Sequence, residues 1–146
     1  MNSLNVFSKG DSDFRIIEKE GIIAGEFNGV VYVNTTPHEI NFGTNDDRVI
    51  VLPTSGILVN ASKEEKVVKV MNNITYVNTS FIGAEEGSSQ IKLIKDLFGD
   101  NCIIVGSIIA AQAFPGSIVG LVSVEGYERV APSEKRMRLD KFTTFE

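Results

Sequence analysis

The residues at 36–39, Thr-Pro-His-Glu, bring a hydroxyl, an imidazole and a carboxylate together in sequence. This is the set of groups used for proton relay to a nucleophile. Neighbouring residues of a strand point to opposite faces, so these three cannot form a relay among themselves. His38 is the single histidine of the chain. We therefore expect Thr36, Pro37 and His38 to form a structural turn, and an enzyme centred on His38 is a lesser alternative.

Metal and cofactor chemistry lacks the necessary side chains. One histidine and one cysteine do not supply the three or four ligands of a zinc site, and the adjacent acidic pairs lack the spacing of a calcium loop. No glycine-rich phosphate loop of standard spacing occurs. Cys102 is followed by Ile-Ile-Val, which favours a buried thiol. The sequence predicts no metal, no cofactor and no enzyme.

What the sequence offers instead is binding chemistry. Aromatic rings can stack a base, guanidinium groups can contact phosphate, and amides and hydroxyls can bind polar edges. On these grounds Phe81 and Phe114 are the candidates for stacking, Arg129 and Arg136 for phosphate, and Asn78, Thr79, Ser107 and Gln112 for polar contacts. The alternative for the arginines is a solvated basic tail at 129–146, which carries five of the fourteen Lys and Arg residues.

Short β-branched and aromatic runs separated by turn residues predict the elements that position these side chains. Strands are expected at 30–34, 39–42, 49–52, 57–59, 66–71 and 75–78, giving a mostly antiparallel sheet. Residues 1–22 are weakly patterned and are expected to form an N-terminal arm or an added hairpin.

The pattern changes after Gly87. Ile91, Ile94 and Phe98 recur at helical spacing and predict an amphipathic helix at about 88–98. A buried strand at 102–105, a second short helix at about 107–113 and a strand at 117–124 follow. Because helices do not alternate regularly with strands, we predict a single α+β domain at 1–146.

A five-residue echo links two of the expected strands. Tyr-Val-Asn-Thr-Thr at 32–36 returns as Tyr-Val-Asn-Thr-Ser at 76–80, with flanks that do not match. We interpret the two copies as ends of two strands of one sheet and not as an internal repeat.

Bulk properties exclude several classes of protein. The chain has 146 residues, 42% hydrophobic and 23% charged, which is typical of one globular domain. A net charge of −5 argues against a dedicated binder of duplex nucleic acid. No apolar run reaches the ~20 residues of a membrane helix. The first residues lack the order of a secretory signal, so we expect a cytoplasmic protein that does not engage a membrane.

Four motifs in order resemble a known family. They are Asn34-x-Thr-Pro-His-x-Ile, Pro53-x-Ser-Gly, the stretch at 104–113 that contains Ile-Val-Gly-Ser and Ala-Gln-Ala, and Ala131-Pro132. Together they resemble phage proteins of the first Thoeris anti-defence family. The resemblance implies an α+β homo-oligomer in the cytoplasm of an infected bacterium, which sequesters a cyclic nucleotide-type immune signal, such as a cyclic ADP-ribose isomer or a cyclic oligonucleotide, without cleaving it.

A second hypothesis needs no small molecule. Exposed hairpins and the acidic pairs at 46–47 and 85–86 could bind a host protein and inhibit it. The chain would then be a protein-interaction module.

Overall fold

The computed structural model describes residues 13–44 and 46–146 and has the predicted α+β fold. Residues 1–12 of the expected N-terminal arm lie outside the described residues. Among residues 13–44 and 46–146, no helix has both the length and the apolar character needed to cross a membrane.

Sheet A has the strand order β1-β2-β3-β8. Its strands are β1 (Phe14–Lys19), β2 (Ile22–Phe27), β3 (Val30–Asn34) and β8 (Ile103–Val105). Two-residue turns at Glu20-Gly21 and Asn28-Gly29 have positive φ at both positions, the geometry that suits the twist of a hairpin. The first strand therefore begins in the segment for which an added hairpin was expected. β8 joins β3 in parallel.

Sheet B has the order β5-β4-β10-β9, with β4 (Ile40–Gly43), β5 (Val49–Leu52), β9 (Gly120–Ser123) and β10 (Met137–Thr143). The segment 129–146, interpreted as a basic tail, thus supplies a strand that lies between β4 and β9. β10 pairs in parallel with β4. Met137, Leu139 and Phe142 pack on the core beneath it, which is the physical reason that this segment is ordered.

Two hydrophobic clusters hold the layers together. One joins sheet A to the helices and is centred on Val33, Ile94, Ile104 and Ile118. The other lies between the two sheets. Tyr32 of sheet A packs there against Phe42 and Phe142 of sheet B, with ring centroids 6.1 and 6.2 Å away.

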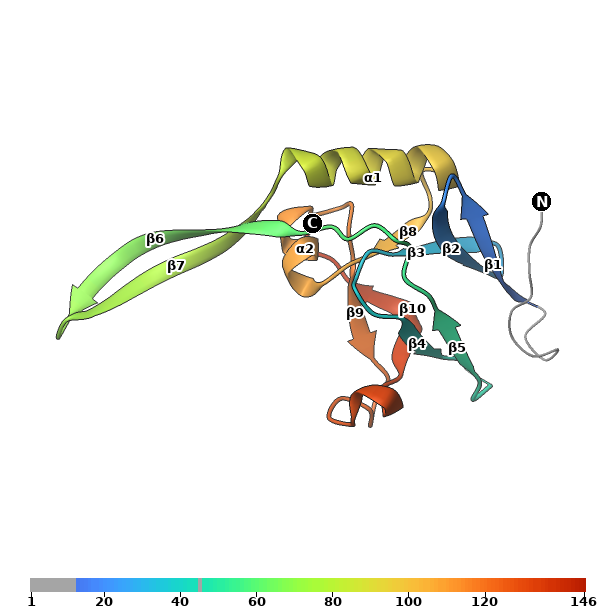
Figure 1. Cartoon of the computed structure of the whole chain (residues 1–146). Coiled ribbons are helices and arrows are strands. Elements are labelled where there is room, and N and C mark those ends of the chain that lie inside the picture. The colour runs from blue at the N-terminus through green and yellow to red at the C-terminus, as the bar shows by residue number, and fades with distance from the viewer. Residues whose placement is uncertain (1–12, 45) are drawn as a thin grey trace.

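Both predicted helices are present, with small differences in their ends. α1 (Glu85–Phe98) begins about three residues before the expected start and buries Ile91 and Ile94. α2 (Ile108–Ala113) is capped by Ser107, whose hydroxyl accepts a hydrogen bond from the Ala110 amide at 3.0 Å. Figure 1 shows α1 crossing the top of the molecule from the base of β7 to the region of β1 and β2.

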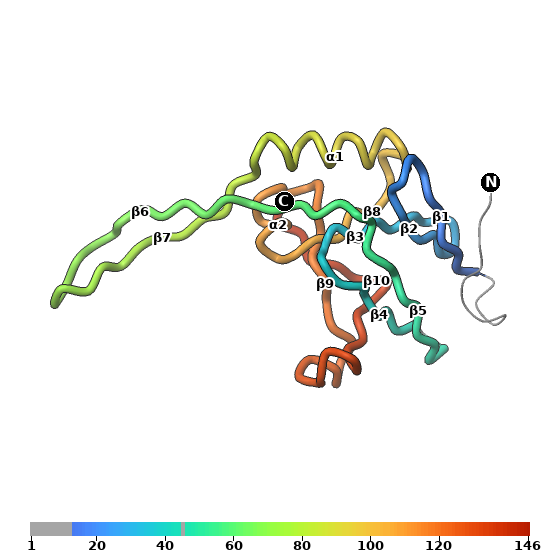
Figure 2. The backbone as a smooth tube through the Cα atoms, in the orientation of Figure 1, coloured from blue at the N-terminus to red at the C-terminus, as the bar shows by residue number. Residues whose placement is uncertain are grey.

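The third sheet is a two-stranded arm that projects from the body (Figures 1 and 2). It consists of β6 (Ala61–Met71) and β7 (Ile74–Gly83). Both strands are much longer than the predicted 66–71 and 75–78. The sequence did not predict the first residues of β6, because the charged run 63–66 places charge on both faces of the strand and so gives no signal of a buried face.

Two further expectations are corrected. Residues 57–59 form no strand, because this segment crosses the ends of sheet A and bonds to the chain there, through Val59 N to Thr35 O at 3.4 Å. The two copies of the echo lie in different sheets. The first ends β3 and is buried, whereas the second lies inside β7 and is exposed.

Candidate functional site: a protruding arm and an arginine-lined hollow

The outer half of the arm, residues 67–77, is closed by a tight turn. Asn72 and Asn73 both have positive φ, at 53° and 63°, so they form a two-residue hairpin turn. The ladder shifts register between Val67 and Lys69, which makes Val68 a bulge. We call residues 67–77 the outer arm.

The outer arm is apolar on both of its faces. Side chains of residues paired across the ladder share a face, and successive residues alternate. Val67, Val77 and Val70 therefore lie on one face, and Tyr76, Ile74 and Met71 on the other. The bulged Val68 adds a seventh apolar side chain. Their exposed fractions run from 37% for Val77 to 61% for Val70.

Such exposure is unfavourable in an isolated molecule. A lone two-stranded hairpin is at best marginally stable in water, and large exposed apolar patches mark interaction sites. Completing the burial of one half-exposed aliphatic side chain contributes roughly 1 kcal/mol, so the seven together amount to roughly 7 kcal/mol. A surface of this kind is suited to being covered by another protein.

The root of the arm is fixed to the body by Phe114. A Cβ built on Gly83 would lie 2.4 Å from Cε1 of this ring, and one built on Gly87 would lie 2.4 Å from its Cζ. Only glycine permits this approach from β7 and α1. Phe114 is 8% exposed, so its ring packs inside the protein and is not free to stack a base.

The polar ligand candidates lie on the arm and on α2. Asn78 and Thr79 are exposed in β7, opposite Lys66 and Glu65, and Phe81 is half-buried opposite Lys63. α2 packs against the base of β6 and β7, and its exposed ends carry Ser107 and Gln112.

The arginine candidates lie elsewhere. Arg129 is exposed in the loop after β9, and Arg136 lies just before β10. This loop and α2 are at opposite ends of β9, as Figure 1 shows. The structure therefore does not bring the eight predicted ligand-binding residues together at one site.

Arg136 contributes to a different feature, an open hollow of about 480 Å³ at the edge of sheet B. Its guanidinium carbon is 5.6 Å from the centroid of the Tyr127 ring, and its Nη1 donates to the carbonyls of Glu134 and Lys135. Arg48 and Arg138 also line the hollow, together with the carboxylates of Asp47, Glu125 and Asp140. The lining is thus mixed in charge.

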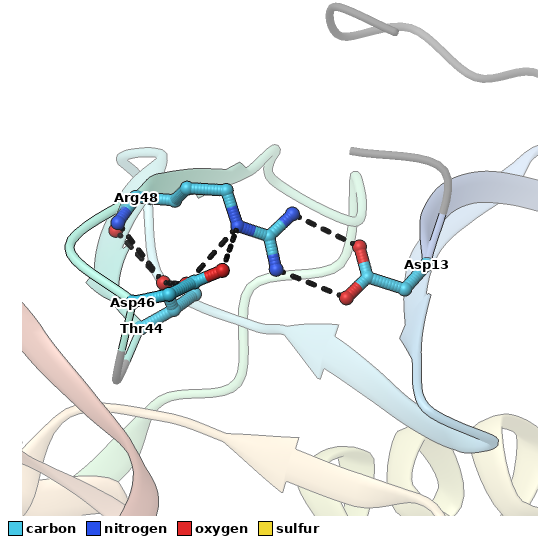
Figure 3. Close-up of polar contacts among 4 residues, drawn as sticks. All are labelled: Asp13, Thr44, Asp46 and Arg48. Carbon is cyan, nitrogen blue, oxygen red and sulfur yellow. Dashed lines mark hydrogen bonds and ion pairs between the residues drawn. The ribbon is translucent and has the colours of Figure 1, made fainter. Parts of the chain in front are cut away.

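A second hollow of about 460 Å³ adjoins the first and is bounded by a clamp centred on Arg48. Figure 3 shows its guanidinium between two carboxylates. Nη1 and Nη2 each donate to one oxygen of Asp13 at 3.0 Å, and Nε donates to Asp46 at 2.9 Å. The clamp ties the start of β1 to the turn between β4 and β5, a pairing that sequence reasoning missed because 35 residues separate its ends.

The clamp lowers the pKa of Asp13, chiefly through the hydrogen bonds from Arg48. A carboxylate whose pKa is depressed by folding adds stability above its ordinary pKa of about 3.8, and that stability disappears as the pH falls through the folded value. Both partners are partly exposed, so the contribution is small.

We expect Arg48→Leu to raise the pKa of Asp13 toward its ordinary value, as measured by carboxyl chemical shifts during an NMR titration. Arg138→Leu is the matched control, because Arg138 pairs instead with Asp140 at 2.9 Å. It should raise the pKa of Asp140 and leave that of Asp13 unchanged. An unchanged Asp13 pKa in Arg48→Leu would contradict the clamp.

The Thr-Pro-His motif forms a structural turn organised by Asn34. Nδ2 of Asn34 donates to the carbonyl of His38 at 2.8 Å, and Oδ1 accepts from the amide and the hydroxyl of Thr36 at 2.9 and 2.7 Å. The Asn34 carbonyl accepts from the Ser55 amide at 2.9 Å, which joins the Pro-Thr-Ser-Gly loop to the same turn. Two of the four motifs that carry the family resemblance therefore meet in space, and the contacts between them are structural.

The remaining reactive groups do not form a site. Burial raises the pKa of the Cys102 thiol, which disfavours the nucleophilic thiolate. The described part of the chain contains no group of three or more His, Cys, Asp or Glu residues able to hold a metal ion. His38 is exposed at the surface of the turn.

Comparisons with models of protein families, with curated proteins and with solved structures found no significant match.

Proposed function

We propose that this chain is a non-catalytic protein-binding module that acts through the β6–β7 arm. The carrying observation is the outer arm, with seven half-exposed apolar side chains spread over both faces. A surface that is apolar on two sides is suited to enter a cleft between protein surfaces, where both faces lose water together.

The inner half of the arm differs from the outer arm, which supports a binding role for the outer arm. Lys63, Glu64, Glu65 and Lys66 keep the part nearest the body solvated, while Phe114 fixes the root against α1 and β7. The arm thus holds the apolar outer arm at a distance from the body. Eleven residues of strand span about 35 Å.

The proposal is tested by photo-crosslinking in the native cell. With a photoreactive benzoylphenylalanine in place of Tyr76, irradiation should join the arm to a protein and give a product of discrete higher mass, which mass spectrometry identifies. The same probe at Val49, an exposed strand position in sheet B, is the matched control. If the Tyr76 probe gives no more product than the Val49 probe, the arm does not bind a protein.

Sequestration of a cyclic nucleotide-type signal is the second candidate function, and the cation–π contact between Arg136 and Tyr127 favours it. An aromatic ring with a guanidinium group beside a hollow of about 480 Å³ could accommodate a base and a phosphate. In a phage this would be an anti-defence role in the host cytoplasm. Incubation with a cyclic ADP-ribose isomer, removal of free ligand and heat release should then return the intact ligand from the wild type and much less from Arg136→Ala.

A further inference from the structure

We propose that the partner of the arm contributes a β-strand, which pairs with the free edge of β7. The partner strand belongs to a different protein and is extended and uncharged. This inference rests on the proposed protein-binding role of the arm and adds the way in which the partner is recognised. Main-chain hydrogen bonds along one edge supply the contact, and side chains on the two faces select the partner.

Only one of the two arm strands has an unprotected edge. The arm is a sheet of two strands, so β6 and β7 each have one edge without a neighbouring strand. Proteins protect such edges with bulges, charged residues and proline. β6 has the bulge at Val68 and five charged residues, which are Lys63, Glu64, Glu65, Lys66 and Lys69. β7 has no charged residue, no proline and no bulge, so its edge is open to a further strand.

The edges of the other two sheets are shorter or charged. β5, β8 and β9 have three or four residues each, and β1 carries Arg15, Glu18 and Lys19. β7 is exposed over residues 74–80, up to the half-buried Phe81, which is enough length for an ordinary strand pairing. Within residues 13–44 and 46–146, β7 is the one edge strand of more than four residues that carries no charge.

The turn of the arm determines which backbone groups face this edge. Met71 and Ile74 flank the two-residue turn, and residues in these positions form a hydrogen-bonded pair. Hydrogen-bonded and non-hydrogen-bonded pairs alternate along an antiparallel ladder. The next pair, Val70 and Thr75, therefore directs its N–H and C=O groups outward. Those of Thr75 face the free edge of β7, and those of Val70 face the free edge of β6.

The order of side chains along β7 favours a different protein over a second copy. On one face, Ile74 and Tyr76 near the tip are apolar, whereas Asn78 and Ser80 nearer the body are polar. A matching strand is apolar beside the first pair and carries hydroxyl or amide groups beside the second. Two-fold pairing of 74–80 with itself is antiparallel and would place Ile74 beside Ser80. It would likewise place Tyr76 beside Asn78, so a second copy does not match.

Proline substitutions at the paired positions 70 and 75 test the edge. Proline has no N–H group, and where that group faces outward the ladder within the arm keeps its own hydrogen bonds. With the photoprobe at Tyr76 in the native cell, Thr75→Pro should lower the yield of crosslinked partner at least about ten-fold. Val70→Pro, the control on the opposite strand, should change the yield less than about two-fold. Equal effects of the two substitutions would overturn pairing at β7.

Hydrogen exchange tests the same edge without any substitution in the arm. In the complex isolated from the native cell, residue-resolved exchange should be at least about ten-fold slower at the Thr75 amide than at the Val70 amide, after correction for intrinsic rates. Equal protection of the two amides would show that the arm is covered without strand pairing.

The outcomes separate this inference from the proposed function. If the Tyr76 probe captures a protein while the two proline substitutions act equally, the binding role of the arm stands and strand pairing is excluded. If the captured protein is a second copy of this chain, the assignment to a different protein is wrong. If the Tyr76 probe gives no more product than the Val49 probe, the proposed function itself fails.

Discussion

Asn34→Ala is expected to lower the free energy of unfolding by about 3 kcal/mol. The side chain is fully buried and makes three hydrogen bonds, one to the carbonyl of His38 and two from Thr36. Each bond contributes about 1 kcal/mol net, and a buried carbonyl left without its donor adds to the loss. Alanine also leaves the turn without the amide that fixes its shape.

Asn78→Ala is the matched control for this effect. Asn78 occupies the equivalent position in the second copy of the Tyr-Val-Asn-Thr echo, but it is exposed in the arm. Its replacement should change the free energy of unfolding by no more than about 0.5 kcal/mol. Urea unfolding followed by circular dichroism measures both variants. Equal losses would mean that the contacts of Asn34 are not what stabilises the turn.

A loss of about 3–5 kcal/mol is expected for Phe42→Ala, which removes a ring from the cluster between the two sheets. Phe42 is 1% exposed and lies 6.1 Å from Tyr32 and 6.3 Å from Phe142, centroid to centroid. The surrounding rings belong to strands of both sheets and cannot all move to fill the space. The variant should therefore retain a cavity.

Phe145→Ala is the control for loss of a ring, since Phe145 is 37% exposed near the end of the chain. Its free energy of unfolding, measured in the same urea series, should lie within about 0.5 kcal/mol of the wild-type value. A Phe42 variant that loses less than about 1 kcal/mol would show that the sheets do not depend on this cluster.

Part of the body could be predicted from the sequence because its signals are local, as the periodic Ile91, Ile94 and Phe98 predict α1. The strands β1 and β2 of sheet A were not among the predicted strands, and β1 lies in the segment for which only an arm or an added hairpin was expected. The partners of the strands could not be predicted. The parallel pairing of β10 with β4 joins segments about 95 residues apart, and nothing in a basic, polar-looking segment indicates that Met137 and Phe142 reach the core.

The candidate site was harder to predict, because composition does not reveal where side chains face. Val67 to Tyr76 contain the apolar residues of an ordinary buried hairpin, with an Asn-Asn turn as the available signal. Their exposure follows from the length of the arm and its distance from the body. Phe114 shows the opposite case, since its position after α2 suits a ligand contact, yet two glycines brought close by the fold enclose it.

Amide hydrogen exchange of residues 67–77 tests the central claim, that the outer arm is a binding surface, most directly. The protein is isolated under native conditions from the cells that produce it, and its exchange is compared with that of the Val70→Lys variant. We predict slow exchange in the outer arm of the native protein and fast exchange in the variant, with equal protection of sheet A in both. Fast exchange of the outer arm in both proteins would contradict the account.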